Sequence, residues 1–117
     1  MSGLVSYCAG LAAEEQVARD YGRRGHALCA RRWRGRGGEI DLIARDGAGY
    51  IFIEVKKARS LARAAERVSR RQLRRVHAAA GEYLGQAPGG LDTPARIDVA
   101  LVDGAGRIEI IENAFFH

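Results

Sequence analysis

The sequence is poor in the features that mark secreted, zinc-binding and membrane proteins. Its 2 cysteines, Cys8 and Cys29, form neither a Cys-x-x-Cys pair nor a zinc-ligand spacing, so we expect two reduced thiols, with a disulfide as the minor alternative. No stretch approaches the ~18 consecutive apolar residues of a membrane span. The first residues lack a basic leader and run into Glu14, which argues against a signal peptide. These absences predict a soluble, cytoplasmic protein without a membrane partner.

The sequence also lacks a recognisable protein nucleophile. It has no Ser-His-Asp or Cys-His pattern, and its 3 histidines share no ligand spacing. What it does have is the length and apolar content of one folded domain. With 117 residues and 47% hydrophobic content, we expect a single domain over residues 1–117 with a core of its own, and no disorder.

Basic residues are concentrated in two parts of the chain. The 19 Lys and Arg exceed the 14 Asp and Glu by five, and seven arginines lie in each of Arg19–Arg36 and Arg59–Arg75. In the second segment they recur at helical spacing as an exposed basic ribbon, which comprises Arg63, Arg67, Arg70, Arg71, Arg74 and Arg75. Such patches predict a polyanionic partner. The alternative is a solvated face in an arginine-rich protein.

Two alternating runs, Glu39–Ala44 and Tyr50–Lys56, flank a polar Asp-Gly-Ala-Gly connection and predict a β-hairpin. The second run begins apolar on both faces, which predicts a central strand. One of these faces ends in Glu54 and Lys56, which are costly to bury without a partner, a metal or water.

A second pair of runs, Arg96–Val102 and Arg107–Ile111, is similar to the first hairpin. Both pairs contain Ile-Asp and Asp-Gly-Ala-Gly at the same relative positions, so that Asp98 matches Asp41. The Glu-x-Lys ending is peculiar to the first pair. An aspartate after isoleucine can therefore be partly structural, whereas the Glu-x-Lys sequence needs another explanation.

Helical spacing predicts a helix over Gly10–Tyr21 and a long helix over Leu61–Gly85. The expected inward residues include Leu11, Val17, Ala18 and Tyr21 in the first and Ala65, Val68, Val76, Ala79 and Tyr83 in the second. Glu14 lies on the first stripe and Gln72 interrupts the second, so each is a satisfied core group or part of a site. The remaining segments predict a strand at His26–Trp33, a glycine-rich basic loop at Arg34–Gly38 and a loop at Gly85–Ala95.

Asp41 and Glu54 are separated by twelve residues on adjacent predicted strands, and Lys56 shares the face of Glu54. If Asp41 lies on that face too, the two carboxylates can hold a hard divalent cation, which prefers oxygen ligands. Such an ion polarises a phosphodiester while the lysine positions water or neutralises developing charge. The alternative is a surface ion pair worth about 0–1 kcal/mol. Glu39 is either a further ligand or a solvated carboxylate.

This motif resembles the Asp…Glu-x-Lys signature of the PD-(D/E)XK, or restriction-endonuclease-like, nuclease superfamily. Over nearly its whole length the chain also looks like the uncharacterised YraN-like family within that superfamily. The resemblance is carried by Gly10, Glu14, Gly25, Trp33, Arg34, Gly38–Ile43, Asp46, Gly47, Phe52–Lys56, Gln72, Arg96–Val99 and Asn113–Phe115. The chain departs from the family pattern at Lys57, Arg71 and Ile97, which leaves substrate contacts open but removes no metal ligand.

The resemblance implies an α/β fold with an αβββαβ core, in which helices flank a mixed central sheet. It also implies a site for Mg²⁺ or Mn²⁺ with Asp41 and Glu54 as metal ligands. Lys56 completes the motif, and Glu14 and Gln72 contribute from the two helices as further catalytic residues.

The resulting hypothesis is a metal-dependent nuclease that hydrolyses DNA or RNA, branched substrates included. Phosphates would be bound independently of sequence by arginines of the ribbon and of the segment Arg31–Arg36, namely Arg32, Arg34, Arg36, Arg70, Arg71 and Arg74. Many junction-cleaving members of the superfamily that the chain resembles act as dimers, so the resemblance leaves a homodimer open. The alternatives are a catalytically silent nucleic-acid-binding module of the same fold and, third, a structural or partner-binding protein.

Overall fold

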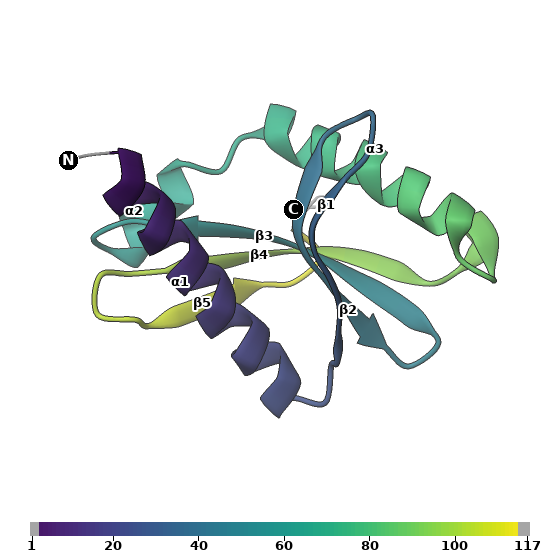
Figure 1. Cartoon of the computed structure of the whole chain (residues 1–117), viewed down its shortest axis with the longest axis horizontal. Helices are drawn as coiled ribbons and strands as arrows, with labels where there is room; N and C mark the ends of the chain where they lie inside the picture. The colour runs from purple at the N-terminus through teal and green to yellow at the C-terminus, as the bar shows by residue number, and fades with distance from the viewer. Residues whose placement is uncertain (1–2, 115–117) are drawn as a thin grey trace.

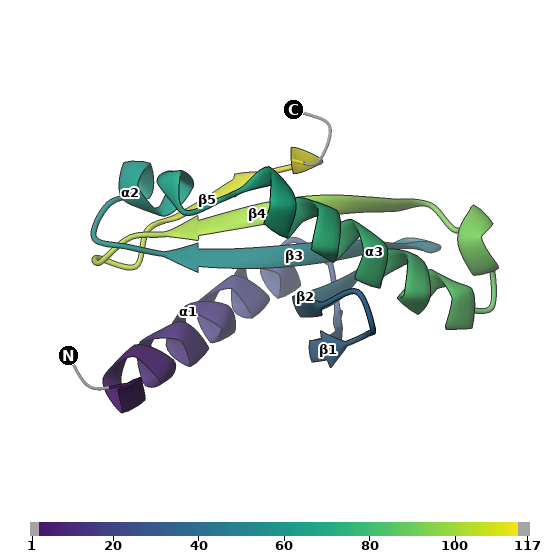
Figure 2. The ribbon, with the colours of Figure 1, turned by 90° about the horizontal axis from the view of Figure 1, so that it is seen from above.

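Five strands form one mixed sheet with helices on both faces (Figure 1, Figure 2). The computed structural model describes residues 3–114, without the side chain of Ser6, so Phe115 of the family-like segment lies outside the described residues. The elements in chain order are α1 (Gly3–Arg23), β1 (Leu28–Arg34), β2 (Glu39–Asp46), β3 (Gly49–Lys57), α2 (Leu61–Glu66), α3 (Arg70–Gln86), the 3₁₀ helix η1 (Gly90–Asp92), β4 (Ala95–Val102) and β5 (Ile108–Ile111). The predicted α/β class is confirmed, and the arrangement is compatible with a restriction-endonuclease-like fold.

The strand order is β1-β2-β3-β4-β5, and only the β3–β4 pair is parallel. A parallel pair needs a crossover connection, which α2 and α3 supply on one face of the sheet while α1 covers the other (Figure 2). β3 is therefore central, as predicted. Its side chains alternate between two cores, because Tyr50 and Phe52 pack with residues of α3, and Ile51 and Ile53 with residues of α1.

The predicted long helix over Leu61–Gly85 is wrong as a single element, because the chain forms α2 and α3 with a break between them. The hydroxyl of Ser69 accepts a hydrogen bond from the N–H of Gln72 at 3.1 Å and caps α3. One helical pattern does not continue across this break. As a result Ala64 is buried, and Ala65, predicted to face inward, is exposed.

The helix α1 starts well before Gly10, the predicted first residue. Leu11 is 36% exposed, so its predicted inward position is wrong, whereas Val17 and Tyr21 are buried as predicted. The second half of α1 packs on the sheet, and its first half extends past the edge of the globule (Figure 2).

The predicted strand and hairpin segments are confirmed, and their ends agree within about two residues. The predicted loop at Gly85–Ala95 is shorter than expected, because α3 continues to Gln86 and η1 lies within the loop. Cys8 and Cys29 are free, exposed thiols. Among the described residues, no helix has both the length and the apolar character that crossing a bilayer requires.

Candidate functional site

The two predicted metal ligands lie where β2 and β3 separate. The last registered pair of these strands is Leu42 with Ile53, and Asp41 and Glu54 are the next residues on the two strands. In place of a further backbone pairing, the N–H of Val55 donates to Oδ2 of Asp41 at 2.8 Å. The Asp41 carboxylate therefore bridges the gap that opens between the strands.

A cavity of about 240 Å³ opens at this gap. Its lining residues come from β2, β3, α3 and the loop before β2, and they are Gly38, Glu39, Asp41, Glu54, Gln72, Arg75 and Val76. Three predicted site residues, Asp41, Glu54 and Gln72, are thus brought together from three elements. We call this space the carboxylate cavity.

Arg75 lines the carboxylate cavity, although the sequence places it only in the basic ribbon. Its spacing of three from Gln72 is the signal that could have found it, because residues three apart share a helix face. Gly38 has a φ of +152°, and a Cβ atom there would lie 3.3 Å from the Cβ of Arg75. A glycine at this position therefore lets the loop before β2 close the cavity against α3.

Glu54 is 5% exposed, and its surroundings disfavour the ionised form. Burial, followed by the hydrogen bond and the charge of Asp41, raises the pKa of Glu54 from its ordinary value of 4.5 to about 9. The ammonium of Lys56 lies 3.6 Å from Oε2 of Glu54 and opposes this shift without cancelling it. Without a cation, these surroundings therefore favour the protonated form of Glu54 at neutral pH.

Glu14 approaches the site from α1 but does not line the carboxylate cavity. Its carboxylate accepts two hydrogen bonds from Arg32, at 3.2 and 3.1 Å. Burial raises the pKa of Glu14, and the charge of Asp41 adds to this, while Arg32 opposes it. Arg32 has a φ of +47°, a strained conformation for a non-glycine residue. The backbone of β1 is thus strained where it supplies the partner of Glu14.

The predicted phosphate-binding arginines fall into two groups. Arg32 pairs with Glu14, and Arg34 pairs with Glu39 at 3.2 Å. The guanidinium groups of the other four form no ion pair within residues 3–114, and all four residues are exposed: Arg36, Arg70, Arg71 and Arg74. This second group is free to contact a polyanion.

The basic loop between β1 and β2 is anchored by Glu82 of α3, a residue that the sequence pattern does not single out. The N–H groups of Arg36 and Gly37 donate to its carboxylate, each at 2.8 Å. These two hydrogen bonds lower the pKa of Glu82. The loop is therefore held against the helix that carries the exposed arginines.

Asp98 matches Asp41 in the sequence of the second hairpin but has a structural role. It is 0% exposed and accepts hydrogen bonds from the Tyr21 hydroxyl at 2.7 Å and the Asn113 N–H at 3.0 Å. The guanidinium of Arg96 also donates to it, at 3.0 to 3.2 Å. Asp98 is fully paired with donors, whereas Asp41 lies beside a second carboxylate.

The donor set of the carboxylate cavity fits a small, hard divalent cation. Mg²⁺ is commonly held by one or two carboxylates and keeps several waters, and Asp41 and Glu54 are two such groups whose repulsion a cation would relieve. Within the described part of the chain, no cluster of three or more His, Cys, Asp and Glu side chains is arranged for a metal. Any ion bound here would need water or substrate oxygens to complete its coordination.

The sequence matches one family and several of its members. The model of the uncharacterised protein family UPF0102 matches residues 13–102. A UPF0102 protein of Ruegeria pomeroyi is 60% identical over 115 residues, which cover 98% of this chain and 94% of the relative. One from Cereibacter sphaeroides is 64% identical, with 98% of both chains covered, and one from Dinoroseobacter shibae is 42% identical over 95% of this chain and 83% of the relative. None of these names states an activity.

Proposed function

Since this chain belongs to the uncharacterised protein family UPF0102, whose name gives no activity, we propose from its own geometry that it is a metal-dependent nuclease. The observation that carries the proposal is the pairing of Asp41 and Glu54 in one cavity, with the ammonium of Lys56 beside Glu54. A buried carboxyl group whose ionisation is disfavoured and which lies beside a second carboxylate in a cavity is a candidate for a functional site, and binding a cation would relieve the cost of ionising it.

The residues of the site can divide the work of phosphodiester hydrolysis. A divalent cation held by Asp41 and Glu54 would polarise a phosphate oxygen and lower the pKa of a bound water. The side chain of Lys56 is 19% exposed, so its ammonium is both held by Glu54 and open to a phosphate or a water. Gln72 offers an amide that can donate to and accept from water. Arg75 places a permanent positive charge on the same wall for the phosphate.

The surface around the site supports nucleic acid as the substrate. The exposed arginines of α3 and of the β1–β2 loop lie on elements that contact each other through Glu82. Contacts of this kind bind phosphates without reading bases, so we expect affinity that is independent of sequence and falls with salt. The proposal covers DNA and RNA, branched forms included.

The direct test incubates the protein with single-stranded, duplex and branched DNA and RNA in Mg²⁺, Mn²⁺ or EDTA. We expect cleavage only with a divalent cation, and a loss of about two to three orders of magnitude in Asp41→Asn and Glu54→Gln, the scale for removing a charge-stabilising group. Asp46→Asn is the matched control. Asp46 is on the same strand as Asp41, but its side chain is 48% exposed and pairs only at 3.8 and 3.9 Å.

A second candidate is a nucleic-acid-binding module of the same fold without turnover. The observation that favours it is the small donor set, because the described residues 3–114 contain no cluster of three or more metal-binding side chains. This candidate predicts salt-sensitive binding that Asp41→Asn leaves unchanged, and no product on any substrate. Absence of both binding and cleavage would refute both candidates.

A further inference from the structure

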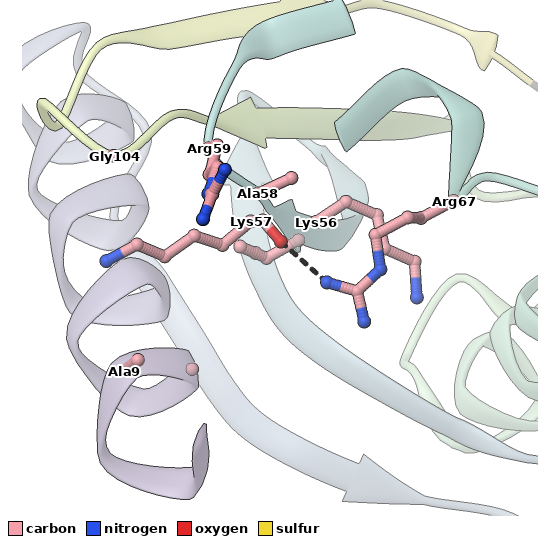
Figure 3. A pocket seen from close by; sticks show the side chains of 9 residues that line it. Ala9, Lys56, Lys57, Ala58, Arg59, Arg67 and Gly104 are labelled. Carbon is pink, nitrogen blue, oxygen red and sulfur yellow. Dashed lines mark hydrogen bonds between the residues drawn. The ribbon is translucent and has the colours of Figure 1, made fainter. Parts of the chain in front are cut away.

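A second, larger cavity of about 500 Å³ lies at the carboxyl end of β3 (Figure 3). We call it the basic cavity. It is lined by Ala9, Gly10, Val55, Lys56, Lys57, Ala58, Arg59, Arg67 and Gly104. Four of these nine residues are cationic and none is acidic, while the others are small or apolar. The cavity therefore concentrates positive charge in a concave space, where the field is stronger than on a flat surface.

The cations of the basic cavity have few partners of their own. Lys56 pairs with Glu54, but within the described residues 3–114 no carboxylate pairs with Lys57, Arg59 or Arg67. Solvated surface charges usually spread apart or alternate in sign, because like charges repel. Several cations that surround one space without acidic partners instead suggest an anionic ligand.

The backbone that carries these cations is held in place. The N–H of Ala58 donates to the carbonyl of Val102 at 3.1 Å, and the N–H of Gly104 donates to the carbonyl of Arg59 at 3.2 Å. Arg67 donates to the carbonyl of Lys57 at 2.7 Å, the bond drawn in Figure 3. One hydrogen bond leaves most of the five guanidinium donors free. The cavity is thus preformed, which reduces the entropy cost of binding a ligand.

The side chains approach the cavity from different directions. In Figure 3 Lys57 extends toward α1, whereas Lys56 and Arg67 lie on the other side of the end of β3. Ala9 and Gly104 also line the cavity, and their small size leaves room between the basic side chains. Cations spread around the end of a strand can contact successive anionic groups of one polyanion, such as a nucleic-acid backbone, which a single carboxylate does not provide.

The basic cavity lies directly beyond the carboxylate cavity along β3. Glu54 lines the first and Val55, Lys56 and Lys57 line the second. Lys56, on the same face of β3 as Glu54, lies about 7 Å from it at roughly 3.3 Å per residue, and Lys57 follows on the opposite face where β3 ends. Phosphates of one nucleic-acid strand follow each other at about 3.4 Å along the axis, so a strand that passes the end of β3 is long enough to reach from one cavity to the other.

We propose that the basic cavity binds a backbone phosphate of the same strand whose scissile phosphate occupies the carboxylate cavity. The identity of this occupant rests on the proposed nuclease function, whereas the anion site itself rests on the cations named above. Lys57 and Arg59 are its principal ligands, because they have no carboxylate partner within the described residues and no part in the carboxylate cavity.

The first test measures binding of an oligonucleotide without terminal phosphates, in EDTA so that no cleavage occurs, at several salt concentrations. The double variant Lys57→Gln/Arg59→Gln is expected to reduce the slope of log K against log salt by about 1.4 to 1.8, at 0.7 to 0.9 for each lost contact. The control Arg19→Gln/Arg23→Gln removes the same charge from exposed positions near the far end of α1, with side chains 58% and 68% exposed. An unchanged slope, or an equal reduction in the control, would overturn the proposal.

The second test follows the amide ¹H–¹⁵N shifts of Gly10 and Gly104 in the wild type. The oligonucleotide should move both signals, and the double variant should abolish the change. Signals that move with inorganic phosphate or a mononucleotide but not with the oligonucleotide would show a site for free phosphates and overturn the proposal. So would signals that do not move at all.

Cleavage assays separate this proposal from the nuclease function. A wild type that cleaves, with a double variant of unchanged salt slope, refutes the basic cavity and leaves the nuclease intact. A wild type that binds through Lys57 and Arg59 without cleaving on any metal refutes the nuclease and supports the phosphate site.

Discussion

Replacing Glu54 by glutamine should make the metal-free protein more stable, not less. The pKa of Glu54 is raised to about 9 in the folded chain, against an ordinary 4.5. A carboxyl group with a raised folded pKa contributes stability that is fully present below its ordinary pKa and is lost as the pH rises toward the folded pKa. The stability of the wild type should therefore fall between about pH 4.5 and pH 9, whereas Glu54→Gln lacks this dependence.

The size of the effect follows from the same shift. Between pH 4.5 and pH 7, a span of about 2.5 pH units, the Glu54 carboxyl group ionises in the unfolded chain but not in the folded one. At 1.36 kcal/mol per unit, the free energy of unfolding of the wild type falls by about 3 kcal/mol over this range. The substitution also removes the partner of Lys56, whose side chain is 19% exposed and therefore remains partly solvated, at a cost of about 1 kcal/mol. The expected net gain is about 2 kcal/mol, or roughly 5–10 °C in Tm for a domain of this size.

Thermal denaturation from pH 5 to pH 9 in EDTA measures this directly. The matched control is Glu109→Gln, because Glu109 is exposed on β5 and does not line the carboxylate cavity. Addition of Mn²⁺ should raise the Tm of the wild type and not that of Glu54→Gln, because a ligand stabilises only the state that binds it. A Glu54→Gln protein less stable than the wild type at pH 8, or a difference that does not change with pH, would refute the reasoning.

Three further predictions concern other groups. Mn²⁺ affinity of the wild type should rise up to tenfold per pH unit below about pH 9, since the cation displaces the proton of Glu54; calorimetry in buffers of different ionisation enthalpy should detect the released proton. Asp98→Asn should cost about 1.5–3 kcal/mol in urea unfolding, because the amide replaces one of the carboxylate oxygens that accept from the buried Tyr21 hydroxyl and from Arg96. Glu82→Gln should speed amide exchange at Gly37, because the Gly37 N–H loses its carboxylate acceptor. In the wild type the protection of this amide should persist down to the ordinary pKa of Glu82 and weaken only below it, since the folded pKa is lowered and protonation removes the acceptor charge.

The sequence correctly predicts that Asp41, Glu54 and Lys56 lie near one another, because the signal is local. Alternation with a period of two places Glu54 and Lys56 on one face of β3, and the hairpin turn brings Asp41 to the neighbouring strand. Only the side-chain alternation and the turn are needed for this, and both can be read within a short window. For the same reason the two hairpins and the central position of β3 are predicted correctly.

Features that depend on packing between distant segments are not predicted. The pairing of Arg32 with Glu14 requires the relative position of β1 and α1, and the anchoring by Glu82 requires the loop to meet α3. The break before α3 is different, because Ser69-Arg-Arg-Gln72 fits the capping-box pattern of serine followed three residues later by glutamine. That local signal competes with a continuing apolar stripe and determines the start of the helix.

The two aspartates that follow isoleucine show why the same local pattern has two outcomes. Asp98 lies inside the sheet, where a hydroxyl, a guanidinium and a backbone N–H compensate the loss of water. Asp41 lies where β2 and β3 separate, so the strands leave one N–H for it and bring Glu54, a second carboxylate, close to it. Burial alone would select against that arrangement. Lys56 and Arg75 offset its free-energy cost only in part, so the distinguishing property of Asp41 is an incomplete set of partners that a cation could complete.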